Sequence, residues 1–89
     1  MISYKWNNEK NILLKKTRGV SFEEIVFQID KGNLLLIMEH HNSEKYSGQK
    51  IMVVKHLNYI YAVPFLEQNN ERFLKTIIPN RKLTKKYLK

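Results

Sequence analysis

The sequence predicts an α+β domain in which a short N-terminal strand and two helices precede a three- to four-stranded antiparallel sheet and a short C-terminal helical turn. Two observations predict this layout. Apolar residues recur at three- and four-residue steps from Phe22 to Ile29, as on a helix, and after Gly32 the period shortens to two, as on strands. Because 43% of the 89 residues are hydrophobic, we expect residues 1–89 to form one domain with one core rather than a disordered chain.

The expected N-terminal strand and first helix follow from alternation and capping. Residues 2–6 alternate between apolar and polar side chains, which predicts a strand at a sheet edge. Asn7 is a good N-cap for a helix over residues 9–17, because its side chain accepts a hydrogen bond from a free N–H of the first turn. Gly19 is the expected stop, since glycine adopts the left-handed conformation without strain.

The second helix has the strongest local signals. Ser21 and Glu24 have the spacing of a capping box, in which each side chain bonds the backbone of the other residue. The apolar residues that follow form one face of a helix up to Ile29, and Gly32 ends the run. We therefore expect this helix to pack one apolar face on the sheet.

The second half of the chain predicts strands joined by polar turns. The expected strands are residues 34–39, 49–56, 59–67 and 72–78. The unbroken apolar run of the first of them indicates burial on both faces. We expect residues 40–48 to form a loop, residues 68–71 a turn, and Leu57 with Asn58 a two-residue hairpin turn in which Asn58 takes positive φ.

Two prolines and a short tail shape the end of the chain. Pro64 lacks an N–H, so it predicts an edge, a bulge or a strand break rather than a continuous central strand. Pro79 ends the last strand. Residues 84–89 suffice for one final helical turn, which depends on docking for its stability.

The positive charge is concentrated at the C-terminal end. The net charge is +8, and residues 72–89 hold seven Lys or Arg and no acid, whereas residues 1–71 are nearly balanced. A concentrated field of one sign attracts a polyanion and releases its counterions on contact. The alternative is a solvated, frayed basic tail.

Several function classes are excluded by what the sequence lacks. Without cysteine the chain has no disulfide, no thiolate nucleophile and no Cys-based metal site, which fits a reducing, cytoplasmic location. Its apolar runs are far shorter than the roughly 20 residues that span a bilayer, so we expect no membrane association. His40 and His41 are adjacent and His56 is distant, which predicts no metal site, and no glycine-rich phosphate loop or nucleophile elbow is present, so we expect no cofactor.

The remaining side chains suit chemistry on a phosphodiester. Attack by the 2′-hydroxyl of RNA needs a base, cations for the phosphorus oxygens and an acid for the leaving oxygen. Arg81 offers a planar guanidinium for a phosphate, and Lys75 interrupts an apolar row on its strand. If Lys75 is partly buried near other cations, its pKa should fall and let it act as a general base; alternatively it snorkels at the sheet margin.

The loop and the basic tail supply further candidates. His40 or His41 offers an imidazole acid or base, although a solvated hairpin connection explains them too, and Tyr46 offers a phenol on which a base can stack. Tyr87 lies among lysines, with docking of the C-terminal turn as its alternative role. We expect the RNA-binding residues to be Lys45, Lys50, Lys82, Lys85, Lys86 and Tyr87.

Both ends of the chain resemble one protein family. Trp6 and Asn7 with Lys10, followed by Arg-Gly-Val-Ser-Phe-Glu-Glu at residues 18–24, resemble the start of BrnT toxins, which have Trp-Asp, Lys and Lys-His-Gly-Val-Ser-Phe-Glu-Glu at the same spacing. Ile-Ile-Pro-Asn-Arg and the basic segment up to Tyr87 resemble the family's ending, Ile-Ile-Ser-Ala-Arg with a basic segment and a Tyr. The middle third matches only in pattern.

The resemblance implies a bacterial type II toxin of the RelE/ParE superfamily with a RelE-like fold. Such a toxin is an RNase that arrests translation, and a ribbon-helix-helix antitoxin encoded beside it neutralises it in a hetero-oligomer. Arg81 carries over from the family pattern, whereas Asn7, Arg18 and Pro79-Asn80 depart from the usual Asp, His and Ser-Ala.

Two other functions stay open. Superfamily members that poison DNA gyrase suggest an inhibitory binding protein, and the basic tail suggests a nucleic-acid-binding module without catalysis. For the antitoxin, the charge gives one hint, because an acidic segment is well suited to mask a basic surface in competition with RNA.

Overall fold

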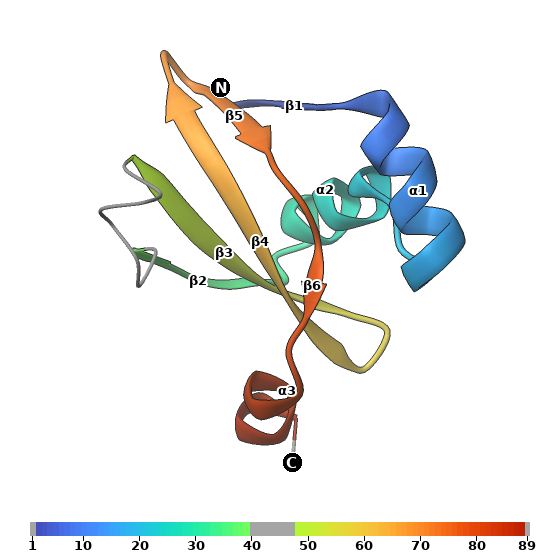
Figure 1. Ribbon diagram of the computed structural model, residues 1–89. Coiled ribbons are helices and arrows are strands. Elements are labelled where there is room, and N and C mark those ends of the chain that lie inside the picture. Colours follow the sequence, from blue (N-terminus) through green and yellow to red (C-terminus); the bar gives the residue numbers. More distant parts are fainter. Residues whose placement is uncertain (1, 40–47, 89) are drawn as a thin grey trace.

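The computed structural model describes residues 2–39 and 48–88 and has the α+β layout that the sequence predicts (Figure 1). A strand and two helices come first, a mixed sheet follows, and a short helix ends the chain. The elements are β1 (Ser3–Trp6), α1 (Asn8–Arg18), α2 (Phe22–Asp30), β2 (Leu34–Glu39), β3 (Gln49–His56), β4 (Tyr59–Gln68), β5 (Glu71–Leu74), β6 (Ile78–Pro79) and α3 (Arg81–Tyr87).

The strands of the described residues form one sheet in the order β1-β5-β4-β3-β2, and β6 pairs with β4 beside β5. β1 runs parallel to β5, and the other pairs are antiparallel. The register places Met52 opposite Val63, with both side chains toward α2, whereas their neighbours Ile51 and Pro64 point to the opposite face. We call these the helix face and the α3 face of the sheet.

Both predicted helix starts are confirmed. Asn7 caps α1, because its Oδ1 accepts a hydrogen bond from the Lys10 N–H at 2.9 Å, and Gly19 ends this helix with a φ of 74°. Ser21 and Glu24 form the predicted capping box at the start of α2. Local signals therefore set the bounds of both helices to within one residue.

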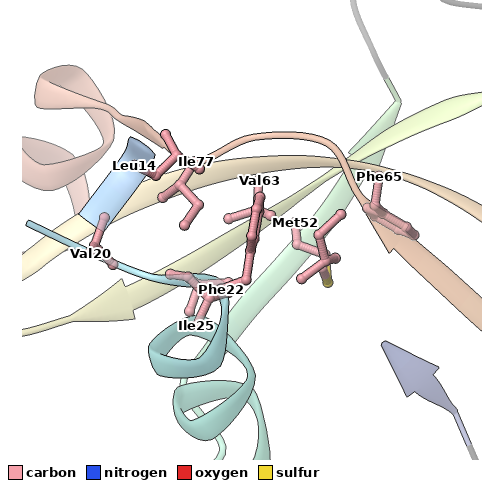
Figure 2. Packing of buried hydrophobic residues seen from close by; sticks show 10 residues of the cluster. Leu14, Val20, Phe22, Ile25, Met52, Val63, Phe65 and Ile77 are labelled. Carbon is pink, nitrogen blue, oxygen red and sulfur yellow. The ribbon is translucent and has the colours of Figure 1, made fainter. Parts of the chain in front are cut away.

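The core lies between α1, α2 and the helix face of the sheet (Figure 2). Trp6 stacks on Phe22 with 5.6 Å between ring centroids, which ties β1 to the start of α2. Phe65 lies at the end of the cluster away from Leu14 and Val20 (Figure 2). The buried members are Leu14, Val20, Phe22, Ile25, Met52, Val54, Val63, Phe65, Leu74 and Ile77.

A buried polar residue joins the two N-terminal helices. Asn11 is 6% exposed, its Oδ1 accepts a hydrogen bond from the Phe22 N–H at 2.7 Å, and its Nδ2 donates to Glu23 Oε1 at 2.6 Å. The side chain thereby satisfies a free N–H at the start of α2. It also links the middle of α1 to the first turn of α2.

The structure corrects the expected burial of residues 34–39. β2 is the last strand of the sheet, and Leu35, Ile37 and Met38 are each about 40% exposed. An edge strand has a neighbour on only one side, and the buried cluster draws its strand residues from β3, β4 and β5 and the segment after β5. The apolar run therefore reflects a partly covered edge and not a central strand.

The expectation at Pro64 is also wrong for its own strand, because β4 is continuous and central. The interruption lies instead in the strand next to β4, which is divided into β5 and β6. β5 pairs with residues 65–68 of β4, and β6 pairs with residues 61–62. Pro64 O accepts from Lys75 N at 2.8 Å, and the N and C=O of one residue point to the same side of a strand. The missing N–H therefore faces the gap between β5 and β6.

The C-terminal elements differ from the predicted bounds. The expected strand 72–78 is divided, because Leu74 and Ile77 are both buried and a three-residue step breaks the two-residue alternation. The last helix begins at Arg81 and not at residue 84, because Asn80 caps it by accepting a hydrogen bond from Leu83 N at 2.9 Å. In the described ranges, none of the helices is long and apolar enough to cross a membrane.

The hairpin turn between β3 and β4 generates a stability prediction. Leu57 has a φ of 48° and is 78% exposed, and Asn58 has the predicted positive φ, at 61°. Asn adopts this conformation more readily than Leu, so Leu57→Asn should raise the free energy of unfolding by roughly 1 kcal/mol in urea denaturation. The control Ile12→Asn removes an exposed apolar residue, 62% accessible, from a helix and should give no gain; equal gains from both variants would contradict the conformational explanation.

Candidate nucleic-acid interface

The basic C-terminal segment is an ordered helix fixed to β4. The backbone of Ile60 makes two hydrogen bonds to it: the carbonyl accepts from Asn80 N, and the N–H donates to Thr84 Oγ1, both at 2.9 Å. Thr84 Oγ1 in turn donates to Asn80 O at 2.8 Å. These bonds hold α3 against the α3 face of the sheet, in contrast to the frayed tail that charge alone allows.

Four cations lie on the exposed side of α3. Their positions in the sequence are one and four residues apart, which places them on one side of a helix, and the residues between them, Leu83 and Thr84, are partly buried. The four are Arg81, Lys82, Lys85 and Lys86. Tyr87 is 38% exposed, with Lys86 Nζ 5.5 Å from its ring centroid. Five predicted site residues are thus brought together on one helix: Arg81, Lys82, Lys85, Lys86 and Tyr87.

A mostly apolar groove of about 400 Å³ lies beside this cationic helix on the α3 face. Asn80 and Lys82 contribute its polar lining. Its apolar lining comes from β2, β3, β4, β6 and α3, namely Met38, Ile51, Ala62, Pro64, Ile78 and Leu83. The groove places an apolar surface directly next to the positive charges.

Lys75 lies in a different place, at an open cleft of about 580 Å³ between the start of α1 and the end of β5. It is exposed, and its Nζ lies 5.4 Å from the ring centroid of Phe73. Lys10 and Glu9 line the same cleft. A general-base role for Lys75 requires that its side chain be partly buried. Because the side chain is exposed, this condition is not met.

The structure does not bring Lys75 and Arg81 together. Lys75 follows β5 next to α1, which is linked to this segment by a hydrogen bond from Arg18 Nη1 to Ile77 O. Arg81 begins α3, beyond the end of β6 (Figure 1). The cleft of Lys75 contains Lys10 and not Arg81 as its second cation.

The other predicted residues are Lys50 on β3 and four residues that lie between β2 and β3 in the sequence. Lys50 is exposed on the helix face, paired with Glu39 on β2 and with Phe65 on β4. His40, His41, Lys45 and Tyr46 lie outside the described residues. Sequence reasoning missed Arg72 and Tyr4, which lie opposite each other on β5 and β1, because only the strand register shows that they are neighbours.

His56 is accounted for by packing. It is 6% exposed, and its Nε2 and Nδ1 lie 3.1 Å from Glu24 Oε2 and Gln28 Nε2, respectively. It thereby joins the end of β3 to α2. Among residues 2–39 and 48–88 no group of three or more His, Asp or Glu side chains is placed to hold a metal ion.

Glu24 is the charged residue at the contact between His56 and α2. Burial raises the pKa of its carboxyl, but hydrogen bonds from Lys15 and Ser21 outweigh burial and hold the pKa below its ordinary value of 4.5. Lys15 Nζ lies 2.5 Å from Glu24 Oε1. Glu24 therefore links α1, α2 and β3 as a carboxylate.

Comparison with known proteins adds no relative: no protein-family model, no curated protein and no solved structure matches the chain.

The Glu24 junction predicts a pH-dependent stability. A carboxyl whose pKa is lower in the folded state stabilises the fold above its unfolded-state pKa and loses this effect as the pH falls through the folded-state pKa. Glu24→Gln should therefore lower the free energy of unfolding by about 1 kcal/mol at pH 7 and by progressively less below pH 4.5.

Urea titrations between pH 3 and 7 measure this difference. Lys15→Met, which removes the ion-pair partner, should reduce the same pH dependence. A loss of stability in Glu24→Gln that is constant over this range would contradict the assignment.

Proposed function

We propose that this protein is the toxin of a type II toxin-antitoxin system, a metal-independent endoribonuclease that cleaves RNA and arrests translation. The observation that carries the proposal is the docked helix α3, whose four cations share one exposed side. Cations held in a fixed array neutralise successive phosphates without the entropic cost of ordering a tail. The resemblance of both chain ends to BrnT toxins supports RNA as the polyanion.

In this proposal α3 binds the RNA chain. Arg81 presents a planar fork to one phosphate, and Lys82, Lys85 and Lys86 contact its neighbours. Tyr87 is exposed enough to stack on a base. Lys75, His40 and Tyr46 remain the candidates that the sequence supplies for stabilising charge and moving protons, with Lys45 and Lys50 as further phosphate contacts.

The partner in the cell would be a cognate antitoxin in the bacterial cytoplasm. An acidic segment of the antitoxin that lies across α3 would compete with RNA for the same four cations. The groove beside α3 offers apolar surface for such a segment. Toxin and antitoxin would then form a hetero-oligomer in which the antitoxin covers the RNA-binding side of α3.

One observation favours a second candidate, a nucleic-acid-binding protein without catalysis. Lys75 and Arg81, which the sequence assigns to one catalytic site, belong to different parts of the surface. Binding through α3 alone would show a steep salt dependence and leave the RNA intact.

RNA integrity after brief induced expression tests the proposal. Wild type should cleave cellular RNA, and Arg81→Ala, at matched protein level, should reduce cleavage at least tenfold because a phosphate contact is lost. Lys31→Ala removes the same charge at the end of α2, away from α3, and should cleave like wild type.

Other results would redirect the assignment. Intact RNA in growth-arrested cells would contradict the nuclease and favour an inhibitory binding protein of the gyrase-poison type. Intact RNA without arrest would favour the non-catalytic binding protein. Full cleavage by Arg81→Ala would contradict the role of Arg81.

A further inference from the structure

A row of three polar side chains crosses the helix face of the sheet. Tyr4 on β1 is the register partner of Arg72 on β5, and Arg72 is the register partner of Glu67 on β4. Register partners on adjacent strands point to the same face. Tyr4 and Glu67 therefore flank Arg72 on opposite sides.

The guanidinium of Arg72 covers the end of the hydrophobic core. Its Cζ lies 5.2 Å from the ring centroid of Phe65, which is at the end of the cluster away from Leu14 and Val20 (Figure 2), and the Arg72 side chain is 11% exposed. Packing against an aromatic ring fixes the plane of the guanidinium. The position of the cation is thereby set by the core and not by its polar neighbours.

The polar contacts of Arg72 are weak for a cation so deeply placed. Nη1 donates to Tyr4 Oη at 3.4 Å and approaches Met52 Sδ at 4.0 Å, and Nε lies 3.6 Å from Glu67 Oε2, which is beyond a normal hydrogen bond. Within the described part of the chain, the buried Nε has no hydrogen-bond partner. The guanidinium is thus ion-paired with Glu67 on its Nε side, and its protein neighbours leave part of its hydrogen-bonding capacity unused, which suits an oxyanion.

We propose that Glu67, Arg72 and Tyr4 form the catalytic centre for RNA cleavage, an inference that rests on the proposed nuclease function. The guanidinium binds the scissile phosphate, and the groups on its two sides are a base and an acid. Neighbouring strands lie about 4.8 Å apart, so Glu67 and Tyr4 are about 10 Å apart at the backbone, with the phosphate between their side chains. In-line displacement at phosphorus needs a base and an acid on opposite sides of the phosphate.

The reaction balances with these groups alone. The Glu67 carboxylate takes the proton of the 2′-hydroxyl, O2′ forms a bond to phosphorus, and the bond from phosphorus to O5′ breaks. The Tyr4 hydroxyl gives its proton to O5′, and Arg72 stabilises the charge on the phosphorus oxygens. The products are a 2′,3′-cyclic phosphate and a 5′-hydroxyl, and exchange with water returns the proton from Glu67 to Tyr4.

Lys50 adds a second cation to this centre. It is exposed on the same face, on β3, where its register partner is Phe65 beneath the Arg72 guanidinium. Its flexible side chain suits contact with the phosphate next to the scissile one. Glu67 is 35% exposed at its side chain, so the base is open to substrate.

Cleavage of a short RNA by the purified chain, and binding of its 2′-O-methyl analogue, test the centre. Glu67→Gln should lower the cleavage rate about 100-fold or more and change the Kd of the uncleavable analogue less than about threefold. Glu71→Gln, which removes the same charge from an exposed position on β5, should cleave like wild type.

The outcomes separate this inference from the proposed function. Wild-type cleavage with an unchanged rate in Glu67→Gln overturns the centre and leaves the nuclease standing. No cleavage of RNA by wild type overturns both. Because Arg72→Lys keeps the charge but loses the fork, it should reduce cleavage at least tenfold while thermal unfolding confirms that it is folded.

Discussion

The structure depends on the central position of β4. All eight residues of β3 pair with it on one side, and β5 and β6 pair with it in turn on the other. The backbone of Ile60 near its start holds α3, and Glu67 near its end belongs to the row across the sheet. A single strand of ten residues therefore positions both the proposed RNA-binding helix and the proposed catalytic centre.

The two faces of β4 have different roles. On the helix face, Val63 and Phe65 join the core, and the charged row with Arg72 lies where that core ends. On the α3 face, Ala62 and Pro64 line the groove beside the cationic helix. Ile60 and Glu67 are seven residues apart, or about 24 Å along a strand, and the two proposed contacts lie on opposite faces, so an RNA that reaches both must pass from one face of the sheet to the other.

Local signals in the sequence predicted the elements well. The helix bounds were predicted from residues that bond or cap the nearest helical turn, namely Asn7, Gly19, and Ser21 with Glu24. The hairpin turn was predicted from Asn58, which lies in the turn itself. These effects depend only on neighbouring residues in the sequence. Effects that depend on the position of a strand were not predicted. Pro64 is accommodated by a gap in the neighbouring strand, which no feature of its own segment reveals.

The same distinction applies to the site. The sequence predicted the cations of α3, because charge clustering within one segment survives folding. It could not predict that Lys75 and Arg81 lie apart, or that Tyr4, Glu67 and Arg72 lie in one row. Residue separations of up to 68 positions are brought together only by strand order and register, as the contact between Arg72 and Tyr4 shows.

The central claim is that the docked helix α3 contacts RNA, and NMR titration of the isotope-labelled protein with a 2′-O-methyl RNA tests it most directly. The account predicts that the largest chemical-shift changes fall on Arg81, Lys82, Lys85 and Lys86, with α3 remaining helical and its Thr84 contact to Ile60 intact. Shift changes confined to α1 and α2, with α3 unaffected, would contradict it.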